Sequence, residues 1–333
     1  MINMRNNGIS FSLIPYPSSL PVIGRLAPSP TGAQHLGNAR TYLIAWLSAR
    51  SRNGTVRLRI EDIDSPRIKP GAAEQSLEEL RWLGLDWDGD PIVQTVRLPL
   101  YESALESLKR QELVYPCTCS RSDIAAAASA PHADHEGPTY PGTCSHRGAS
   151  DAATLIAERK PFAWRFRIVE SPLFHDLYAG ELRIDLKQLG GDFVVWKSAG
   201  TPAYQLAVVV DDAAMGITEV IRGDDLIPST PRQLLVYESL GFAPPAFAHV
   251  PLVVGEDGRR LAKRHGDTRL AALRDGGVKP EAVVGLLAWS CGWIDRPEPI
   301  AARELLPLFR LAAIPPQPFV LTDQLLERIG YRG

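Results

Sequence analysis

The sequence lacks several features that mark particular classes of protein. It has no run of about 18 apolar residues, which excludes a transmembrane helix of ordinary length. Its formal net charge is only −2, so it is not a strongly basic chain of the histone kind, although a local basic patch can still bind nucleic acid. The first 22 residues are broken by prolines and contain no continuous apolar segment or small-residue cleavage site. We therefore expect residues 1–22 to be a tail rather than a secretion signal, with Met4 as a second possible start.

Cysteines are also few, with four among 333 residues. Without a secretion signal, we expect a cytoplasmic protein with free thiols or a metal site rather than disulfides. Cys117 and Cys119 are one residue apart, and Cys144 follows in "TYPGTCSHRG". Thiolates are soft ligands, and a structural zinc takes four ligands in a tetrahedron. Three reduced thiols without a metal are the alternative, and Cys291 is expected to be a buried small residue.

Strand and helix patterns alternate from Val22 to about Trp87. "PVIGRLAP" and "TVRLRIED" are typical of strands, whereas "NARTYLIAWLSARSR" and "GAAEQSLEELRWLG" have the spacing of helices. This order predicts an α/β fold with a doubly wound parallel sheet, whose ligand crevice lies at the carboxyl ends of the strands. We expect "LAVVVDD", which ends in two acids, to be a further buried strand.

Shifts in composition predict how the chain is divided. A Rossmann-like catalytic domain is predicted from residues 23–114 and 189–250. Residues 115–188 hold most of the cysteines, an Ala/Ser/Pro/His-rich stretch and short strands, so we expect a small inserted α/β subdomain there. Residues 251–333 are expected to form a basic loop and a short helical segment with proline-rich breaks.

The stretch "GRLAPSPTGAQHLGNART" leads from turn-forming residues through His35 and Gly37 into an apolar helix. A helix N-terminus presents unpaired N–H groups and a partial positive charge, which suit a phosphate, and His35 adds a hydrogen-bond donor. The segment is not a P-loop, because GxxxxGK[ST] is absent. Taken alone, it is equally compatible with a proline-rich turn and an incidental histidine.

A second segment, "GRRLAKRHGDTRL", gathers positive charge between glycines. It contains Arg259, Arg260, Lys263, Arg264 and His265. A cationic loop can neutralise charge that develops on a triphosphate during phosphoryl or nucleotidyl transfer. Taken alone, a solvated basic loop is the alternative.

The two segments together resemble a known family. "HLGN" and "RLAKR" resemble the HIGH and KMSKS motifs of class I aminoacyl-tRNA synthetases and stand in the same order. "RLAPSPTG", "RIEDID" and "VVVDD…GITEVIRGDDL" are similar to the glutamyl-tRNA synthetase branch, from about Gly24 to about Leu270. Asn38 replaces the second His of HIGH, and Ala262 replaces the Ser of KMSKS. The resemblance implies the class I catalytic fold, with a zinc-containing inserted subdomain.

The resemblance implies a role for each matching residue. Glutamate would bind to Arg25, Ala27, Ser29, Glu61, Tyr204 and Arg222. ATP would bind to Pro28, His35, Gly37, Asn38 and Lys263, with His35 and Lys263 in catalytic roles. A guanidinium suits a carboxylate, and an acid such as Glu61 suits an ammonium. Independently, selection of glutamate needs an arginine for its side chain, and Arg222 follows a predicted strand. For Glu61 and Asp62, a surface acid pair is the alternative.

The resemblance also implies a zinc ligand set. The set is Cys117, Cys119, Tyr140 and Cys144. Tyr140, four residues before Cys144, matches the fourth ligand in a subset of the family, whereas His146 matches the ligand in another subset.

The length of the chain favours one branch of the family. Ordinary glutamyl-tRNA synthetases continue into a helical anticodon-binding domain, which we do not expect here. The chain resembles a short branch whose members activate glutamate with ATP and Mg²⁺ and transfer it to queuosine at the wobble position of tRNA(Asp). Gln205, where the longer enzymes more often carry His, agrees with this branch. The expected partner is the anticodon arm of tRNA(Asp), bound by a monomer.

Two other interpretations stay open. One is a truncated glutamyl-tRNA synthetase that charges tRNA 3′ ends, and the missing C-terminal domain argues against it. The other is a non-catalytic synthetase-like module that binds tRNA or glutamate as a regulator. The retention of both nucleotide motifs argues against this second interpretation.

Overall fold

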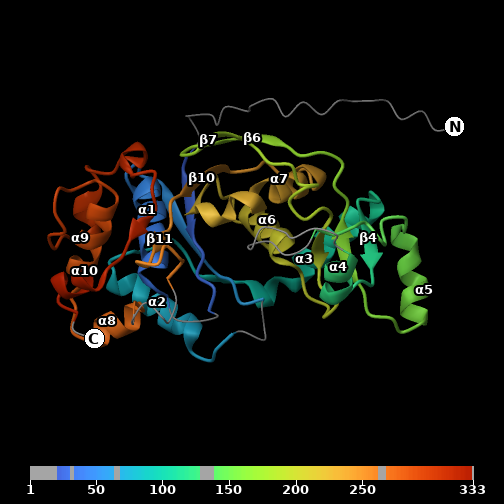
Figure 1. Cartoon of the computed structure of the whole chain (residues 1–333), viewed down its shortest axis with the longest axis horizontal. Helices are drawn as coiled ribbons and strands as arrows, with labels where there is room; N and C mark the ends of the chain where they lie inside the picture. Colours follow the sequence, from blue (N-terminus) through green and yellow to red (C-terminus); the bar gives the residue numbers. More distant parts are fainter. Residues whose placement is uncertain (1–20, 31–33, 64–67, 128–138, 262–267, 332–333) are drawn as a thin grey trace.

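The computed structural model describes residues 21–30, 34–63, 68–127, 139–261 and 268–331. Most of the predicted tail and the predicted ATP-binding Lys263 lie outside these residues. The molecule is elongated: β4 (Val114–Cys117) and α5 (Ala152–Ala157) lie near one end, and α9 (Pro280–Ser290) and α10 (Asp323–Arg328) lie near the other (Figure 1).

The alternation predicted for the first part of the chain is confirmed. The elements are β1 (Ile23–Leu26), α1 (Leu36–Arg50), β2 (Thr55–Ile60) and α2 (Ala72–Trp82). β1 pairs in parallel with β2, which pairs in parallel with β3 (Ile92–Val93). Gly54 allows the backbone of the turn between α1 and β2 to approach Val22 closely. A Cβ at this position would lie 2.5 Å from the carbonyl oxygen of Val22, which is too short for a real contact.

Four further strands form a sheet in the order β7-β6-β10-β9. Their bounds are β6 (Leu173–Asp176), β7 (Gly180–Arg183), β9 (Glu219–Gly223) and β10 (Ala246–Val250). β10 is parallel to both β9 and β6, and β7 is antiparallel to β6. β1 lies beside β9, and the N–H of Thr218 donates to the carbonyl oxygen of Ile23 at 2.9 Å. The predicted α/β fold with a parallel sheet is confirmed.

Helices cover both faces of this sheet. α1 and α9 share one apolar core with Ile221 and Ala248. α3 (Leu98–Arg110), α6 (Tyr204–Ala214) and α7 (Thr230–Ser239) share the other core with Val220 and Phe247. Adjacent residues on a strand point to opposite faces, so these neighbours on β9 and β10 enter different cores. The sheet is therefore doubly wound.

One predicted strand is wrong. The segment "LAVVVDD" lies in α6, and every residue from Leu206 to Asp212 is buried. A helix that is buried on all sides shows no polar stripe, so a short apolar run cannot be distinguished from a buried strand by its pattern. Tertiary packing also overrides the modest preference of valine for strands.

The cysteine-containing region has its own antiparallel sheet. β5 (Ala163–Phe166) pairs with β4 and with β8 (Phe193–Trp196), and α4 (Arg121–Ala127) and α5 accompany them. β8 follows the boundary predicted at residue 188, whereas β6 and β7 precede it and join the parallel sheet. Strand pairing therefore crosses that boundary, and the division into domains stays a prediction.

The last part of the chain contains α8 (Leu270–Asp275), α9 and α10, but it is not purely helical. β12 (Phe319–Val320) pairs in parallel with β11 (Val253–Val254), directly after the proline-rich break. Short 3-10 turns complete the described structure at η2 (Gln94–Arg97), η3 (Ala149–Asp151), η4 (Asp224–Ser229), η6 (Ala302–Leu305) and η7 (Leu311–Ala313). No helix in the described part of the chain has the length and apolar character needed to cross a membrane.

Candidate active site

A cavity of about 520 Å³ lies where β1, β2 and β9 end and α1 begins. Nine of the predicted site residues line it: Arg25, Ala27, Ser29, His35, Gly37, Asn38, Glu61, Tyr204 and Arg222. Pro28 is not in its lining, but its carbonyl oxygen accepts a hydrogen bond from the N–H of Glu61 at 3.0 Å. The fold therefore brings together residues that are far apart in the sequence.

The N-terminus of α1 differs from the expectation of open N–H groups. His35 is the N-cap, and its Nδ1 accepts from the N–H groups of Gly37 at 3.1 Å and Asn38 at 3.4 Å. Asn38 Oδ1 accepts in return from the N–H of His35 at 3.1 Å, which completes a capping box. The N–H of Leu36 donates to the carbonyl oxygen of Thr268. The first turn therefore offers a phosphate its dipole and the ring of His35, not unpaired amides.

The cap also fixes the chemistry of the His35 ring. Because Nδ1 accepts hydrogen bonds, the neutral ring carries its proton on Nε2. Burial, and then the positive charge of Arg260, lower the pKa of His35 to about 4. A Cβ on Gly37 would lie 3.0 Å from His35 Cε1 and Nδ1, so the glycine makes room for the ring. His35 is thus a neutral hydrogen-bond donor at the cavity wall.

A buried ionic network lies behind the cavity and holds two of its charged residues. Arg59 is fully buried on β2, and its Nη2 donates to Glu61 Oε1 at 2.9 Å. Its Nη1 donates to Asp212 Oδ1 at 2.5 Å. The same oxygen of Asp212 lies 3.4 Å from Arg25 Nε. Arg59 and Asp212 therefore fix the positions of Glu61 and Arg25, which face the cavity.

Asp211, the other acid of α6, is fully buried and anchors a different group of residues. Its carboxylate accepts from Gln94 Nε2 at 2.7 Å, Arg97 Nε at 2.6 Å and the Tyr101 hydroxyl at 2.8 Å. The adjacent acids thus tie α6 to β2, η2 and α3. Sequence reasoning noticed the acid pair but did not predict these partners, because each lies more than a hundred residues away in the chain.

Arg222 lies within β9, not after a strand as predicted, and is buried. Its Nε donates to His249 Nε2 at 3.0 Å, and its Nη2 donates to Thr230 Oγ1 at 2.8 Å. Its Nη1 is buried and has no hydrogen-bond partner among the described residues. An unpartnered guanidinium nitrogen at a cavity wall is suited to a carboxylate ligand.

The described start of the basic loop also reaches the cavity. Arg260 Nη1 lies 2.7 Å from Asp225 Oδ2, and both residues line the cavity wall together with Leu261. Residues 262–267, which include the predicted Lys263, lie outside the described structure.

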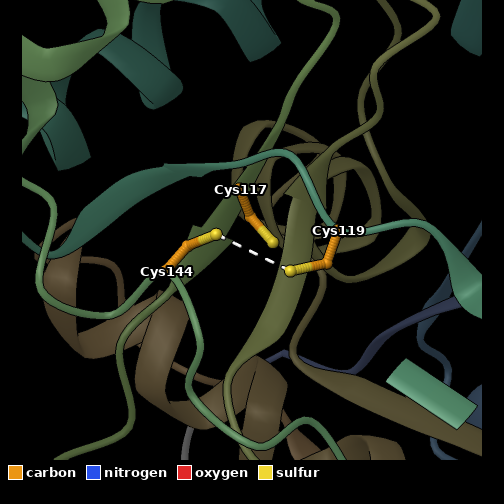
Figure 2. A group of neighbouring side chains, drawn as sticks. All are labelled: Cys117, Cys119 and Cys144. Carbon is orange, nitrogen blue, oxygen red and sulfur yellow. Dashed lines mark hydrogen bonds between the residues drawn. The ribbon is translucent and has the colours of Figure 1, made fainter. Parts of the chain in front are cut away.

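The fold brings the three predicted cysteine ligands together near the end of the molecule that holds β4, far from α9 (Figure 1). The Sγ atoms of Cys117, Cys119 and Cys144 all lie within 4.8 Å of one another and point toward a common centre (Figure 2). The Sγ atoms of Cys119 and Cys144 lie 3.6 Å apart. Such a triad of thiols can bind a metal ion.

The two residues predicted as alternatives for the fourth metal ligand, Tyr140 and His146, differ in whether they lie beside the thiols. Tyr140 is buried, and its hydroxyl oxygen lies 3.5 Å from Cys117 Sγ. This hydroxyl also accepts from the N–H of Cys144 at 2.8 Å. His146 is exposed and is not part of the cluster. Arg165, whose Nε lies 3.3 Å from Cys117 Sγ, adds a positive charge beside the thiols.

The thiols differ in acidity. Burial acts to raise the pKa of Cys144, but hydrogen bonds involving Thr118, Cys119 and Tyr140 outweigh it and lower the pKa to about 7. Burial, followed by the neighbouring thiols, raises the pKa of Cys119 to about 11. A thiolate is the metal-binding form of cysteine, so Cys144 is the most readily available ligand of this pair.

The chain matches a family of known catalytic domains. Residues 21–304 match the model for tRNA synthetases class I (E and Q), catalytic domain. A curated glutamyl-Q tRNA(Asp) synthetase from Rhodopirellula baltica is 57% identical over 280 residues, covering 80% of this chain and 84% of that protein. Another from Symbiobacterium thermophilum is 51% identical over 305 residues, covering 89% of this chain and 94% of that protein.

The fold is likewise similar to solved structures. A crystal structure of a glutamate tRNA ligase from Elizabethkingia meningosepticum, in complex with its amino acid, matches with a TM-score of 0.80 at 27% identity. The match covers 93% of this chain and 69% of that one.

Proposed function

We propose a function for this protein from one premise: the chain belongs to the glutamyl-Q tRNA(Asp) synthetase family, a group of class I ligases related to glutamyl-tRNA synthetases. The proposal is that it activates glutamate with ATP and transfers the glutamyl group to queuosine at the wobble position of tRNA(Asp). The sequence similarity over most of the chain supports it. Monomeric state and cytoplasmic location stay predictions.

The arrangement of charge in the cavity is the observation that carries the proposal. Glutamate has two carboxylates and one ammonium group, and the cavity wall presents Arg25, Arg222 and Glu61. The unpartnered Nη1 of Arg222 suits the side-chain carboxylate, because a buried donor without a partner costs free energy that a bound carboxylate offsets. Glu61, held by Arg59 at 2.9 Å, suits the ammonium.

The remaining predicted glutamate ligands complete this wall. Ser29 Oγ lies 3.5 Å from Glu61 Oε2, and Ala27 and Tyr204 line the same cavity. Their proposed task is to shape the pocket around the amino acid and hold its α-carboxylate toward ATP. A substrate held in this way reacts as if its concentration were very high.

In the proposed first step, an α-carboxylate oxygen of glutamate attacks the α-phosphorus of ATP, which enters with Mg²⁺. The bond between this phosphorus and the bridging oxygen to the β-phosphate breaks, and pyrophosphate leaves. His35 donates from Nε2 to a phosphate oxygen, and the N-terminus of α1 adds the positive end of its dipole. Gly37 and Asn38 shape this part of the site, and Lys263 is assigned to the developing charge. Pro28, which lies outside the lining, is proposed to support the site through its hydrogen bond with Glu61.

In the second step, a hydroxyl oxygen of queuosine attacks the carbonyl carbon of the glutamyl adenylate. The bond from this carbon to the phosphate oxygen breaks, AMP leaves, and the hydroxyl proton is released. The chemistry needs no covalent enzyme intermediate. The chain therefore contributes binding, orientation and electrostatic stabilisation.

We also assign the cysteine cluster to a zinc ion. Three thiols within 4.8 Å of one another and a hydroxyl 3.5 Å from Cys117 Sγ fit a four-ligand site. The proposed ligands are Cys117, Cys119, Tyr140 and Cys144. When bound, the ion would supply structural cross-linking between β4 and the segment around Cys144.

The test is attachment of labelled glutamate to total tRNA from cells with and without queuosine. Nuclease digestion then locates the label within the tRNA. We expect label only in queuosine-containing samples and only in the anticodon fragment of tRNA(Asp). Label at the 3′-terminal adenosine that is independent of queuosine would instead identify a tRNA-charging enzyme, and binding of ATP without any label would favour the regulator.

A further inference from the structure

A chain of buried polar side chains crosses three neighbouring strands and ends at the cavity. Asp176 lies on β6, His249 on β10 and Arg222 on β9, and the strands are adjacent in the order β6-β10-β9. His249 and Arg222 are direct partners in the parallel register of their strands. All three side chains are buried. The sheet itself therefore sets the spacing of this chain of contacts.

The donors and acceptors between Asp176, His249 and Arg222 can be assigned in only one way. His249 Nδ1 lies 2.6 Å from Asp176 Oδ2, and His249 Nε2 receives the Nε–H of Arg222 at 3.0 Å. A guanidinium has only donors, so Nε2 must be the accepting nitrogen and Nδ1 must carry the ring proton. The carboxylate of Asp176 then accepts that proton's hydrogen bond. Asp176 thus selects the tautomer that can hold Arg222.

Two further contacts restrict the guanidinium. Thr230 Oγ1 accepts from Arg222 Nη2 at 2.8 Å. The Arg222 guanidinium carbon lies 5.1 Å from the centre of the Phe247 ring, which is stacked on His249. Nε and Nη2 are therefore both engaged, whereas Nη1 is buried without a hydrogen-bond partner among the described residues. Arg222 itself lines the cavity. A long arginine side chain loses less conformational entropy on binding a ligand if it is already fixed.

We propose that Asp176 and His249 are positioning residues, which hold Arg222 so that its Nη1 faces the carboxylate of the amino-acid substrate. The inference rests on the proposed function only for the identity of that substrate. Burial, and after it the positive charges of Arg222 and Arg25, lower the pKa of His249 and outweigh Asp176, whose hydrogen bond and charge act to raise it. The ring therefore stays neutral, and its Nε2 is free to accept.

Asp176 also has a structural task that the experiment must separate from positioning. Its Oδ1 accepts from the N–H groups of Tyr178 at 3.0 Å and Ala179 at 2.8 Å, so it stabilises the turn after β6. Replacing Asp176 would disturb this turn as well as His249. The substitutions are therefore made at His249.

His249→Phe keeps a planar ring but removes the acceptor for Arg222, whereas His249→Gln supplies a side-chain oxygen at a similar reach. Tyr115→Phe is the control, because it removes a partly buried hydrogen bond of 2.6 Å from the Tyr115 hydroxyl on β4 to Asp192, far from Arg222 in the sequence. Glutamate-dependent exchange of pyrophosphate into ATP, measured with queuosine-containing tRNA present, gives KM for glutamate and for ATP separately.

For His249→Phe we expect KM for glutamate to rise about tenfold or more, which is the effect of losing one charge-assisted hydrogen bond. KM for ATP should stay within about twofold, and His249→Gln should recover most of the glutamate affinity. Tyr115→Phe should lower the melting temperature without changing KM for glutamate. An unchanged KM for glutamate in His249→Phe, with active wild-type protein, overturns the positioning role.

A second measurement does not depend on the proposed substrate. The ¹⁵N shifts of His249 in the folded protein report which ring nitrogen carries the proton. A protonated Nδ1 and a bare Nε2 support the positioning role, whereas a proton on Nε2 overturns it. Wild-type protein without any exchange activity would overturn the proposed function, while the ring shifts would still decide the role of His249.

Discussion

Arg59 on β2 and Asp212 on α6 form a buried ion pair, in which Arg59 Nη1 donates to Asp212 Oδ1 at 2.5 Å. The pair lies one side chain behind the cavity, because Arg59 also holds Glu61 and Asp212 also faces Arg25. Replacing Asp212 removes the closest carboxylate partner of the buried Arg59, which then keeps, among the described carboxylates, only Glu61 at 2.9 Å and Asp211 at 3.8 Å. The cost of desolvating a buried charge is offset only by its attraction to opposite charges and by its hydrogen bonds, so this loss should be large.

Asp212→Asn should therefore lower the free energy of unfolding by about 3 kcal/mol and raise KM for glutamate. Urea denaturation and pyrophosphate exchange measure the two effects. Glu298→Gln is the control, because it removes an ion pair with Arg296 whose side chains are 73% and 67% exposed. We expect that control to change stability by less than about 1 kcal/mol. If the two variants lose the same free energy of unfolding, the buried ion pair contributes no more to stability than the exposed one.

The stability of the protein should depend on pH through His35. Its pKa is lowered from 6.5 to about 4 by burial and by Arg260. As pH falls from about 6.5 toward about 4, the unfolded chain binds a proton that the folded protein excludes, so the free energy of unfolding decreases. The contribution of the neutral His35 to the free energy of unfolding is fully present above pH 6.5. Below that pH it decreases by at most about 1.4 kcal/mol per pH unit.

His35→Asn isolates this effect, because asparagine is a good N-cap but does not titrate. We expect the loss of stability between pH 7.5 and pH 5, measured by urea denaturation, to be smaller in this variant than in the wild type. His249 has a lowered pKa and contributes with the same sign, but it is present in both proteins. Identical pH dependence in the two proteins would contradict the assignment of a neutral, half-buried His35.

Much of the fold was predictable because its signals are local. The helices and strands from β1 to α2 follow from apolar periodicity within single segments. α6 was mistaken for a strand because burial on every side removes the polar stripe that would identify a helix. β12 was not expected because two residues after a proline-rich break carry no periodicity.

The candidate site was predictable only where a family motif marks a residue. Arg25, Glu61 and Arg222 were predicted from such motifs, and the fold gathers them at one cavity. Arg59 was not predicted, because it alternates with apolar residues on β2 and so resembles a residue on a solvated face. The sheet is covered on both faces, and Arg59 is fully buried. Charged residues inside apolar strands are the signal that could have revealed it.

The three-cysteine cluster leads to a prediction about metal content. Wild-type protein should contain about one zinc ion per chain, and Cys144→Ser should lose it, because one ligand of four is removed. Cys291→Ala is the matched control, since Cys291 is a buried free cysteine outside the cluster. Elemental analysis by mass spectrometry measures the content. Wild-type protein without metal after growth in zinc would contradict the site.

The fourth zinc ligand can be tested separately. Tyr140→Phe keeps the buried ring and removes the hydroxyl beside Cys117, whereas His146→Ala changes an exposed side chain. We expect Tyr140→Phe to release zinc to a chelator about ten times faster or more, and His146→Ala to behave as the wild type. The release is followed with a colorimetric zinc indicator. The opposite order of the two variants would assign the fourth position to His146.

Gly37→Ala should disturb the ATP site through a single steric contact. The added Cβ would lie 3.0 Å from His35 Nδ1 and Cε1 and 3.6 Å from Val253 Cβ, so the ring of His35 must move. Loss of the His35 cap would lower the free energy of unfolding by about 1 kcal/mol. Alanine would raise it by about the same amount, because alanine favours a helix more than glycine does, so the net change in stability should be small. We expect KM for ATP to rise while KM for glutamate changes little. Gly148→Ala, where the nearest atom lies 3.7 Å away, is the control.

A double-mutant cycle shows whether the ring carries this effect. In a His35→Ala background no ring remains to be displaced, so adding Gly37→Ala should change neither KM for ATP nor stability in the unfavourable direction. The coupling between the two substitutions should then nearly equal the effect of Gly37→Ala in the wild type. Additive effects would mean that the glycine acts elsewhere, for example against Val253, and that the close approach of His35 does not shape the ATP site.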